Sequence, residues 1–178
     1  MDDSAQTVQI IGSIKAVAAD QWNALTAGMP LLSHAFLSAL ESSRSVGDGT
    51  GWTPCIIVIE QQDVLIGAVP LYIKTHSYGE YVFDWAWADA YQQNGINYYP
   101  KLLAAIPFSP ITSARLLADQ LGTKRLLIDA LGSIMQTHGL SSAHVLFPDE
   151  PDASLLAEAG WMKRNGLAWW LGPNWLFM

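Results

Sequence analysis

The stretch 76–101 constrains the fold most, because it combines many aromatic rings with acids and has no Lys or Arg before its last residue. Glu80, Asp84 and Asp89 are interleaved with rings at Tyr78, Tyr81, Phe83, Trp85, Trp87, Tyr91, Tyr98 and Tyr99. A carboxylate beside buried rings loses water and holds its proton longer, which is the environment of a general base or a cation site. The competing interpretation is a buried aromatic core with solvated acids, which composition alone favours.

The spacing within this stretch predicts a helix over residues 84–94. Glu80, Asp84, Trp87 and Tyr91 fall at i, i+4, i+7 and i+11, which would place both acids and both kinds of ring on one stripe. Alanines at 86, 88 and 90 favour helix, and Asn94-Gly95 suits its end. We therefore predict that Glu80 or Asp84 has a raised pKa and faces a pocket.

The composition is that of one ordinary domain. A chain of 178 residues with 51% hydrophobic and 14% charged residues can bury a real core and is not disordered. The net charge of −7 and the scattered positions of its nine Lys and Arg residues argue against a nucleic-acid interface. Its partners are expected to be small molecules or peptides.

Cysteine usage and the first residues predict a cytoplasmic protein. Cys55 is the only cysteine, which fits a reducing compartment, and its apolar neighbours suggest a buried strand thiol. The acidic start at residues 1–4 is not a signal peptide, and no run reaches the ~20 apolar residues of a membrane span.

Hydrophobic periodicity and turn residues predict the other elements. Strands are expected at 8–14, 55–61, 64–72, 101–108 and 143–147, with a last hairpin at 161–171. Helices are expected from Asp20, from Ser33, near Ala114, and at 116–120, 126–136 and 153–159, the last capped by Asp152. Pro70 cannot donate to a strand ladder, so it marks an edge, a bulge or a point where the strand splays.

Two histidines outside the aromatic stretch receive ordinary interpretations. His138 lies at a predicted helix end, and we assign it no chemistry. His144 lies inside a short apolar strand, where a hydrogen-bonded core histidine is a commoner arrangement than a catalyst.

Motifs in register connect the chain to a known family. They are GWTP at 51–54, YIK at 72–74, SYGEYVFDW at 77–85, ADAY at 88–91, YYPK at 98–101, PFSP at 107–110 and RLL at 115–117. In these motifs the chain resembles, from about Trp22 to Arg164, the bacterial FemAB-like proteins of peptidoglycan biosynthesis or recognition. The resemblance implies an α+β fold of the GNAT-like (acyl-CoA N-acyltransferase) type, with a mixed sheet flanked by helices.

The resemblance also implies an activity, namely transfer of an acyl or aminoacyl group to an amine without a covalent intermediate. Such transfer needs a base for the amine's proton, a donor near the carbonyl oxygen and an acid for the leaving group. Glu80 or Asp84 would be the base, Tyr98 or Tyr99 the acid, and His76 a second candidate. The acceptor would be a small-molecule or peptide amine, such as a peptidoglycan-type peptide.

Acyltransferases of the fold that the chain resembles hold the pyrophosphate of acyl-coenzyme A between a strand and a helix N-terminus. The corresponding residues here are Ser109, Thr112, Ser113 and Arg115. The loop lacks the usual glycines, and Pro110 lacks an N–H donor, so we predict that coenzyme A binds weakly or not at all. Arg115 could bind an anion or be a solvated first-turn residue.

Two other functions compete with transfer. As a binding module, the aromatic stretch would recognise a cationic or amide-bearing ligand by ring stacking and carboxylates. As a degenerate fragment, the chain would have only a structural use. No Ser-His-Asp pattern, Walker loop or metal-ligand spacing indicates another enzyme class.

The resemblance further implies a single GNAT-like domain over 1–178, the first half of a family that usually has two. Residues 76–100 would be an aromatic and acidic insertion, and 169–178 an atypical apolar tail. Rings in this tail need a burial site. They lie at Trp169, Trp170, Trp175 and Phe177. We predict that the tail packs against a second copy of the chain in a homodimer.

Overall fold

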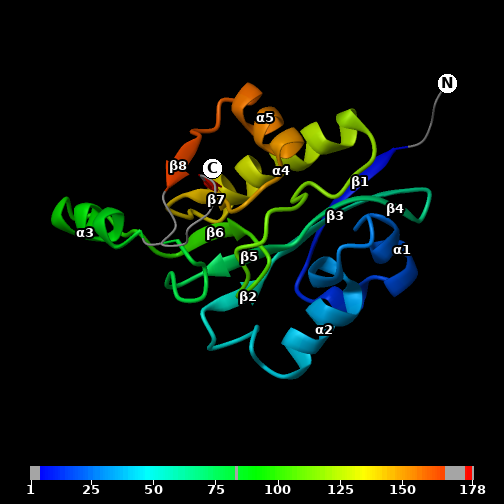
Figure 1. Ribbon diagram of the computed structural model, residues 1–178, viewed down its shortest axis with the longest axis horizontal. Helices are drawn as coiled ribbons and strands as arrows, with labels where there is room; N and C mark the ends of the chain where they lie inside the picture. The colour runs from blue at the N-terminus through cyan, green and yellow to red at the C-terminus, as the bar shows by residue number, and fades with distance from the viewer. Residues whose placement is uncertain (1–4, 83, 167–174, 178) are drawn as a thin grey trace.

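Two β-sheets form the middle layer of the protein, which has the predicted α+β class (Figure 1). The computed structural model describes residues 5–82, 84–166 and 175–177. The first sheet is antiparallel in the order β1-β3-β4, and the second has the order β2-β5-β6-β7, with β6 and β7 parallel. The strands are β1 (Gln6–Ile11), β2 (Trp52–Pro54), β3 (Ile56–Gln61), β4 (Val64–Val69), β5 (Leu71–Lys74), β6 (Lys101–Ala104) and β7 (Ala143–Val145).

Pro70 divides the predicted strand 64–72 between the two sheets. β4 pairs with β3 on one side of this proline, and β5 pairs with β2 and β6 on the other. Cys55 donates its N–H to Leu71 O at 2.8 Å, so one long hairpin continues from the first sheet into the second. The prediction that Pro70 marks a break in the ladder is confirmed.

Helices cover both faces of the sheets (Figure 1). α1 (Ala19–Ala24) and α2 (His34–Ser42) lie on one side with η1 (Ile14–Ala16) and η2 (Pro30–Leu32). α4 (Leu121–Thr137) and α5 (Glu150–Glu158) lie on the other. Alternate residues of β3 point to opposite faces of the sheet. Ile57 and Ile59 pack in the hydrophobic cluster that includes residues of α4, whereas Ile56 and Val58 pack in the cluster that includes Trp22. Burial of each such side chain contributes about 1.5–3 kcal/mol to the free energy of unfolding.

The segment 109–120 differs from the prediction. No helix begins near Ala114 or spans 116–120, and the helix expected at 126–136 is part of a longer helix, α4, which begins at Leu121. Asp152 Oδ2 accepts the N–H groups of Arg115 and Leu116 at 2.7 and 2.8 Å, and Leu117 forms a β-bridge with Ala68. These long-range hydrogen bonds replace the local ones that a helix would need.

Asp152 is also wrongly predicted as a helix cap. α5 begins three residues earlier than expected, and its N-cap is Asp149, whose Oδ1 accepts the N–H of Asp152 at 3.1 Å. The fully buried carboxylate of Asp152 instead pairs with Lys124 Nζ at 2.6 Å and with the backbone of 115–116.

α3 (Trp85–Gln93) extends away from the layers at one end of the molecule (Figure 1). Its bounds confirm the helix predicted over 84–94 to within one residue, yet none of its residues is buried. None of the described helices is long and apolar enough to cross a membrane.

The final hairpin pairs β8 (Arg164–Gly166) with β9 (Trp175–Phe177). Its second strand lies beyond the predicted hairpin 161–171. Trp169 and Trp170 lie outside the described residues. The predicted homodimer remains a prediction.

Candidate functional site

Glu80 and Asp84 are buried, while Asp89 and several rings of the aromatic stretch are exposed, which reverses the interpretation of a ring core with solvated acids for two of the three acids. Glu80 and Asp84 are 3% and 5% exposed, whereas Tyr78 is 65% and Trp85 49% exposed. Glu80 precedes α3, so the predicted stripe on one helix does not form. Buried carboxylates need compensating charge.

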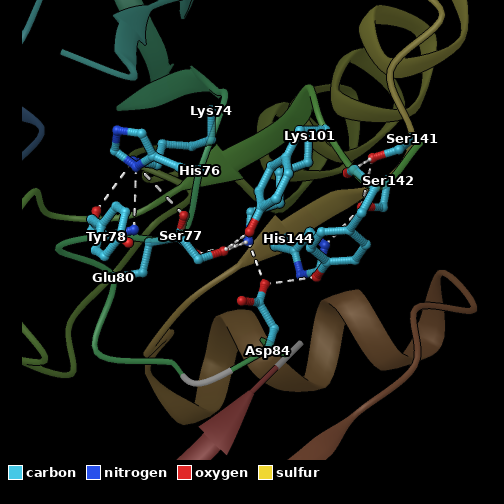
Figure 2. A network of polar contacts seen from close by, with 12 residues as sticks. Lys74, His76, Ser77, Tyr78, Glu80, Asp84, Lys101, Ser141, Ser142 and His144 are labelled. Carbon is cyan, nitrogen blue, oxygen red and sulfur yellow. Dashed lines mark hydrogen bonds and ion pairs between the residues drawn. The ribbon is translucent and has the colours of Figure 1, made fainter. Parts of the chain in front are cut away.

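Lys101 supplies that charge at the centre of a buried network (Figure 2). Its Nζ donates to Glu80 Oε2 at 2.8 Å, to Asp84 Oδ2 at 2.6 Å and to Ser77 Oγ at 2.8 Å. An ammonium has three N–H donors, so Lys101 has none left for a ligand.

Lys74 lies beside Lys101 because the two are register partners in the β5–β6 pair. Its Nζ is 3.8 Å from Glu80 Oε1, 3.7 Å from the centre of the Trp52 ring, and donates to Tyr78 O at 3.3 Å. The sequence analysis missed both lysines. The available signal was a charge at the end of each of two apolar strands that flank the acidic stretch.

The network shifts the pKa values of its members. Burial raises the pKa of Glu80 despite the opposing effect of Lys101, which is the direction predicted for at least one of the two acids. Burial also acts to raise the pKa of Asp84, but the hydrogen bond and charge of Lys101 outweigh it and the pKa is lowered. Burial lowers the pKa of Lys74 to about 8.

Tyr98 and Tyr99 join the network from above the acids. Tyr98 OH donates to Asp84 Oδ2 at 2.7 Å, and Tyr99 OH is hydrogen-bonded to Ser77 Oγ at 2.8 Å. Burial, and for Tyr98 also the bond to Asp84, raises the pKa of both phenols. Both therefore stay protonated at neutral pH.

His76 lies beside the network and not in it. Its Nδ1 accepts the N–H of Tyr78 at 3.2 Å, which leaves Nε2 to donate to Thr50 O at 3.1 Å. The ring occupies the space above Gly51, where a Cβ would lie 2.1 Å from His76 Nε2. Both ring nitrogens thus fix the loops of residues 50 and 78.

A pocket of about 230 Å³ lies against Tyr98, between α3, β7 and the start of β8. A second cavity of about 440 Å³ has Tyr98 and Tyr99 in its wall. Neither Glu80 nor Asp84 is among the residues that line them. The first pocket, called here the His144 pocket, is lined by Trp87, Tyr91, Tyr98, Ser142, Ala143, His144, Trp161, Met162 and Arg164.

His144 is the titratable imidazole of this pocket. Its Nε2 is hydrogen-bonded to Ser142 Oγ at 2.8 Å, and its ring packs edge-on to Tyr98 with centres 6.2 Å apart. Burial, helped by the charge of Lys101, lowers its pKa to about 4, so it is neutral at pH 7. It is hydrogen-bonded, as the sequence analysis expected, but it lines a pocket.

The predicted cofactor residues lie apart from the network. Lys101 is the first residue of β6, whereas the predicted cofactor residues come after the last residue of this strand. They are Ser109, Thr112, Ser113 and Arg115. The Arg115 guanidinium is fully buried and donates to Leu146 O, Ile111 O and Ser113 Oγ, so it is neither solvated nor free for an anion. Burial lowers its pKa to about 10.

No group of three or more His, Cys, Asp or Glu side chains in the described part of the chain has a metal-site arrangement.

Comparison with known proteins gives one family. A family model described as FemAB-like, peptidoglycan biosynthesis/recognition, matches residues 13–174. A search of curated proteins gave no match. The matched range contains the buried network, the His144 pocket and the segment 109–115.

Proposed function

Since the chain belongs to the FemAB-like family of peptidoglycan biosynthesis/recognition proteins, we propose that it transfers an acyl or aminoacyl group to an amine of a peptidoglycan-type peptide. The His144 pocket carries this proposal. It offers ring faces for the apolar part of a peptide, polar groups at Ser142 and His144, and a floor that the buried network holds rigid through Tyr98.

The transfer would be direct. The amine nitrogen attacks the acyl carbonyl carbon, a new C–N bond forms, the bond to the leaving group breaks, and the nitrogen loses a proton. His144 lines the pocket and is neutral at pH 7, so in this proposal it accepts that proton after the attack has made the nitrogen positively charged and acidic, and it then gives the proton to the leaving group. Glu80 and Asp84 act as positioning residues, because both are buried and paired with Lys101.

Tyr98 and Tyr99 position the peptide in the same scheme. Their raised pKa values make them poor proton donors to a leaving group, so they contribute ring contacts and hydrogen bonds. His76 supports the loop that carries Ser77.

The acyl donor is a separate part of the proposal. Asp152 already occupies the N–H groups of Arg115 and Leu116, which supports weak or absent binding of coenzyme A at 109–115. Calorimetry with acetyl-coenzyme A should detect no binding at micromolar concentrations. A micromolar dissociation constant that Thr112→Trp abolishes would contradict this.

The main test uses a peptidoglycan-type peptide with a free side-chain amine. Calorimetry measures its binding, and mass spectrometry detects its acylation after incubation with acyl-coenzyme A or aminoacyl-tRNA. We expect His144→Gln to lose most of the transfer. The matched control is His138→Gln, since His138 is exposed at the end of α4, and it should keep wild-type transfer. If the wild-type chain does not bind the peptide, the proposal fails.

Recognition without chemistry is the second candidate. The observation that favours it is that both predicted bases are already neutralised inside the protein by Lys74 and Lys101. Peptide binding without any acylated product, with every donor supplied, would select this second function.

A further inference from the structure

The guanidinium of Arg164 lies over the face of Trp87, with 3.8 Å between its central carbon and the ring centre. Arg164 is partly buried and, in the part of the chain that the structure describes, is the only charged residue that lines the His144 pocket. Among the described residues, no carboxylate lies within ion-pair distance of it, whereas Lys74, Lys101, Lys124, Arg125 and Lys163 each have an acidic partner.

Stacking on Trp87 fixes the plane of the guanidinium and leaves its N–H groups along the edge. Such an edge matches the two oxygens of a carboxylate, which it can bind through two parallel hydrogen bonds. The pocket wall adds no competing acid, and His144 is neutral at pH 7. The nearby acids Glu80 and Asp84 are balanced by Lys74 and Lys101.

We propose that Arg164, held against Trp87, binds a carboxylate of the ligand in the His144 pocket. This inference rests on the proposed function and makes it more specific, because it assigns the pocket to a peptide with a free carboxylate. It differs from the alternative of a cationic ligand, since the acids expected to bind a cation are buried and the charge in the pocket is positive.

The test compares two probes that differ in one group. They are an N-acetylated peptide that ends in D-Ala-D-Ala with a free carboxylate, and the same peptide with a C-terminal amide. Calorimetry at low salt should show the free acid binding the wild-type chain at least tenfold more tightly than the amide. Arg164→Gln should remove this preference, and Trp87→Leu should weaken it.

The matched control is Arg125→Gln, because Arg125 is an exposed arginine whose ion pair with Glu158 spans 4.0 Å. It should keep the tenfold preference. Thermal unfolding of each variant establishes that it is folded, and Arg164→Lys, which keeps the charge but loses the planar fork, should retain only part of the preference.

Three results would overturn the inference: equal binding of acid and amide, no binding of either, or a preference that survives in Arg164→Gln. Inorganic phosphate competing better than acetate would assign the site to a phosphate and would also overturn it. These results can be told apart from a failure of the proposed function. If the free acid binds through Arg164 but no acylated peptide forms, only the proposed acyl transfer is contradicted. If the peptide is acylated but the free acid binds no more tightly than the amide, only this inference is contradicted.

Discussion

Lys101 has all three of its N–H groups committed inside the protein, and two carboxylates depend on it. Glu80 Oε1 and Asp84 Oδ1 have no hydrogen-bond partner among the described residues, and the second ammonium of the network, Lys74, lies 3.8 Å from Glu80 Oε1, beyond hydrogen-bond distance. Breaking one side of a buried ion pair is costly because the remaining charge stays in a low-dielectric surrounding.

We predict that Lys101→Met lowers the free energy of unfolding at pH 7 by about 3–5 kcal/mol, measured by urea denaturation. The loss should shrink in acid, where the two carboxyls become protonated. Arg125→Met is the matched control, since its ion pair is exposed and should contribute within about 0.5 kcal/mol. A loss below about 1 kcal/mol for Lys101→Met would show that the network does not hold these charges.

His144 should give the protein a second, separate pH dependence. Its pKa is about 4 when folded and about 6.5 when unfolded, so the unfolded state binds more protons between these values. The free energy of unfolding should therefore fall by on the order of 3 kcal/mol as the pH drops from 6.5 to 4. Glu80 acts in the opposite direction because its pKa is raised.

Comparison with His144→Gln isolates this effect. Urea midpoints at several pH values between 7 and 4 should fall more steeply for the wild-type chain than for the variant. His138→Gln should keep the wild-type slope. Parallel curves for wild type and His144→Gln would show that the pKa of His144 is not lowered.

At this scale the sequence indicated two acids and two tyrosines that the structure brings together, but not the lysines that pair with the acids. Glu80, Asp84, Tyr98 and Tyr99 do come together. Lys74 and Lys101 flank the acids in sequence, and the pairing of β5 with β6 brings the two lysines together beside them. Arg164 lies some eighty residues from Trp87 in sequence, and no local pattern connects the two.

Single elements were predictable where local signals decided them. The turn at Gln62 and Asp63, both with positive φ, the helix start at Ser33 and the break at Pro70 follow from residue chemistry. The segment 114–120 has a helical pattern, but Asp152, more than thirty residues away, takes its first N–H groups. Gly122 and Thr123 fall between the helices expected at 116–120 and 126–136, but in the structure they lie inside α4.

The contact between β4 and α4 is close enough to test by substitution. A Cβ at Gly67 would lie 2.6 Å from Thr123 Cγ2. Gly67→Ala should therefore reduce the free energy of unfolding by about 1–3 kcal/mol. Thr123→Ser removes the clashing methyl, so the double variant should be more stable than the two single losses added together.

Gly132→Ala is the control for this pair. It lies in α4 with nothing within 4 Å of its added Cβ, and it should stabilise by about 0.5–1 kcal/mol through helix propensity. Strict additivity of Gly67→Ala and Thr123→Ser would show that the two elements are not in contact there.

The whole molecule combines a layered body with one outlying helix. The sheets are covered on both faces, and α3 extends away from them (Figure 1). α3 has no buried residue, and its Trp87 and Tyr91 line the His144 pocket. Regions with little apolar burial open locally at low free energy. The resemblance to the FemAB-like proteins predicts the α+β class, but nothing in it or in the helical pattern indicates that α3 would extend away from the body.

We predict that amide hydrogens of α3 exchange roughly 100-fold or more faster than those in the middle of α4, as measured by hydrogen–deuterium exchange. α4 serves as the internal reference because its Leu127 and Leu131 are buried. Asp84→Asn should speed exchange in α3 further and leave α4 unchanged. Equal protection of the two helices would contradict a separately opening α3.

The charged attachment of α3 also bears on how the protein responds to cold. Exposing apolar surface raises the heat capacity, and exposing polar surface lowers it. Opening the body exposes its aliphatic clusters, whereas releasing α3, none of whose residues is buried, exposes little apolar surface. The free energy of unfolding of the body therefore passes through a maximum as temperature changes. The equilibrium constant for release of α3 should instead give a nearly straight van 't Hoff plot. Cooling would weaken the layers and leave the helix in place.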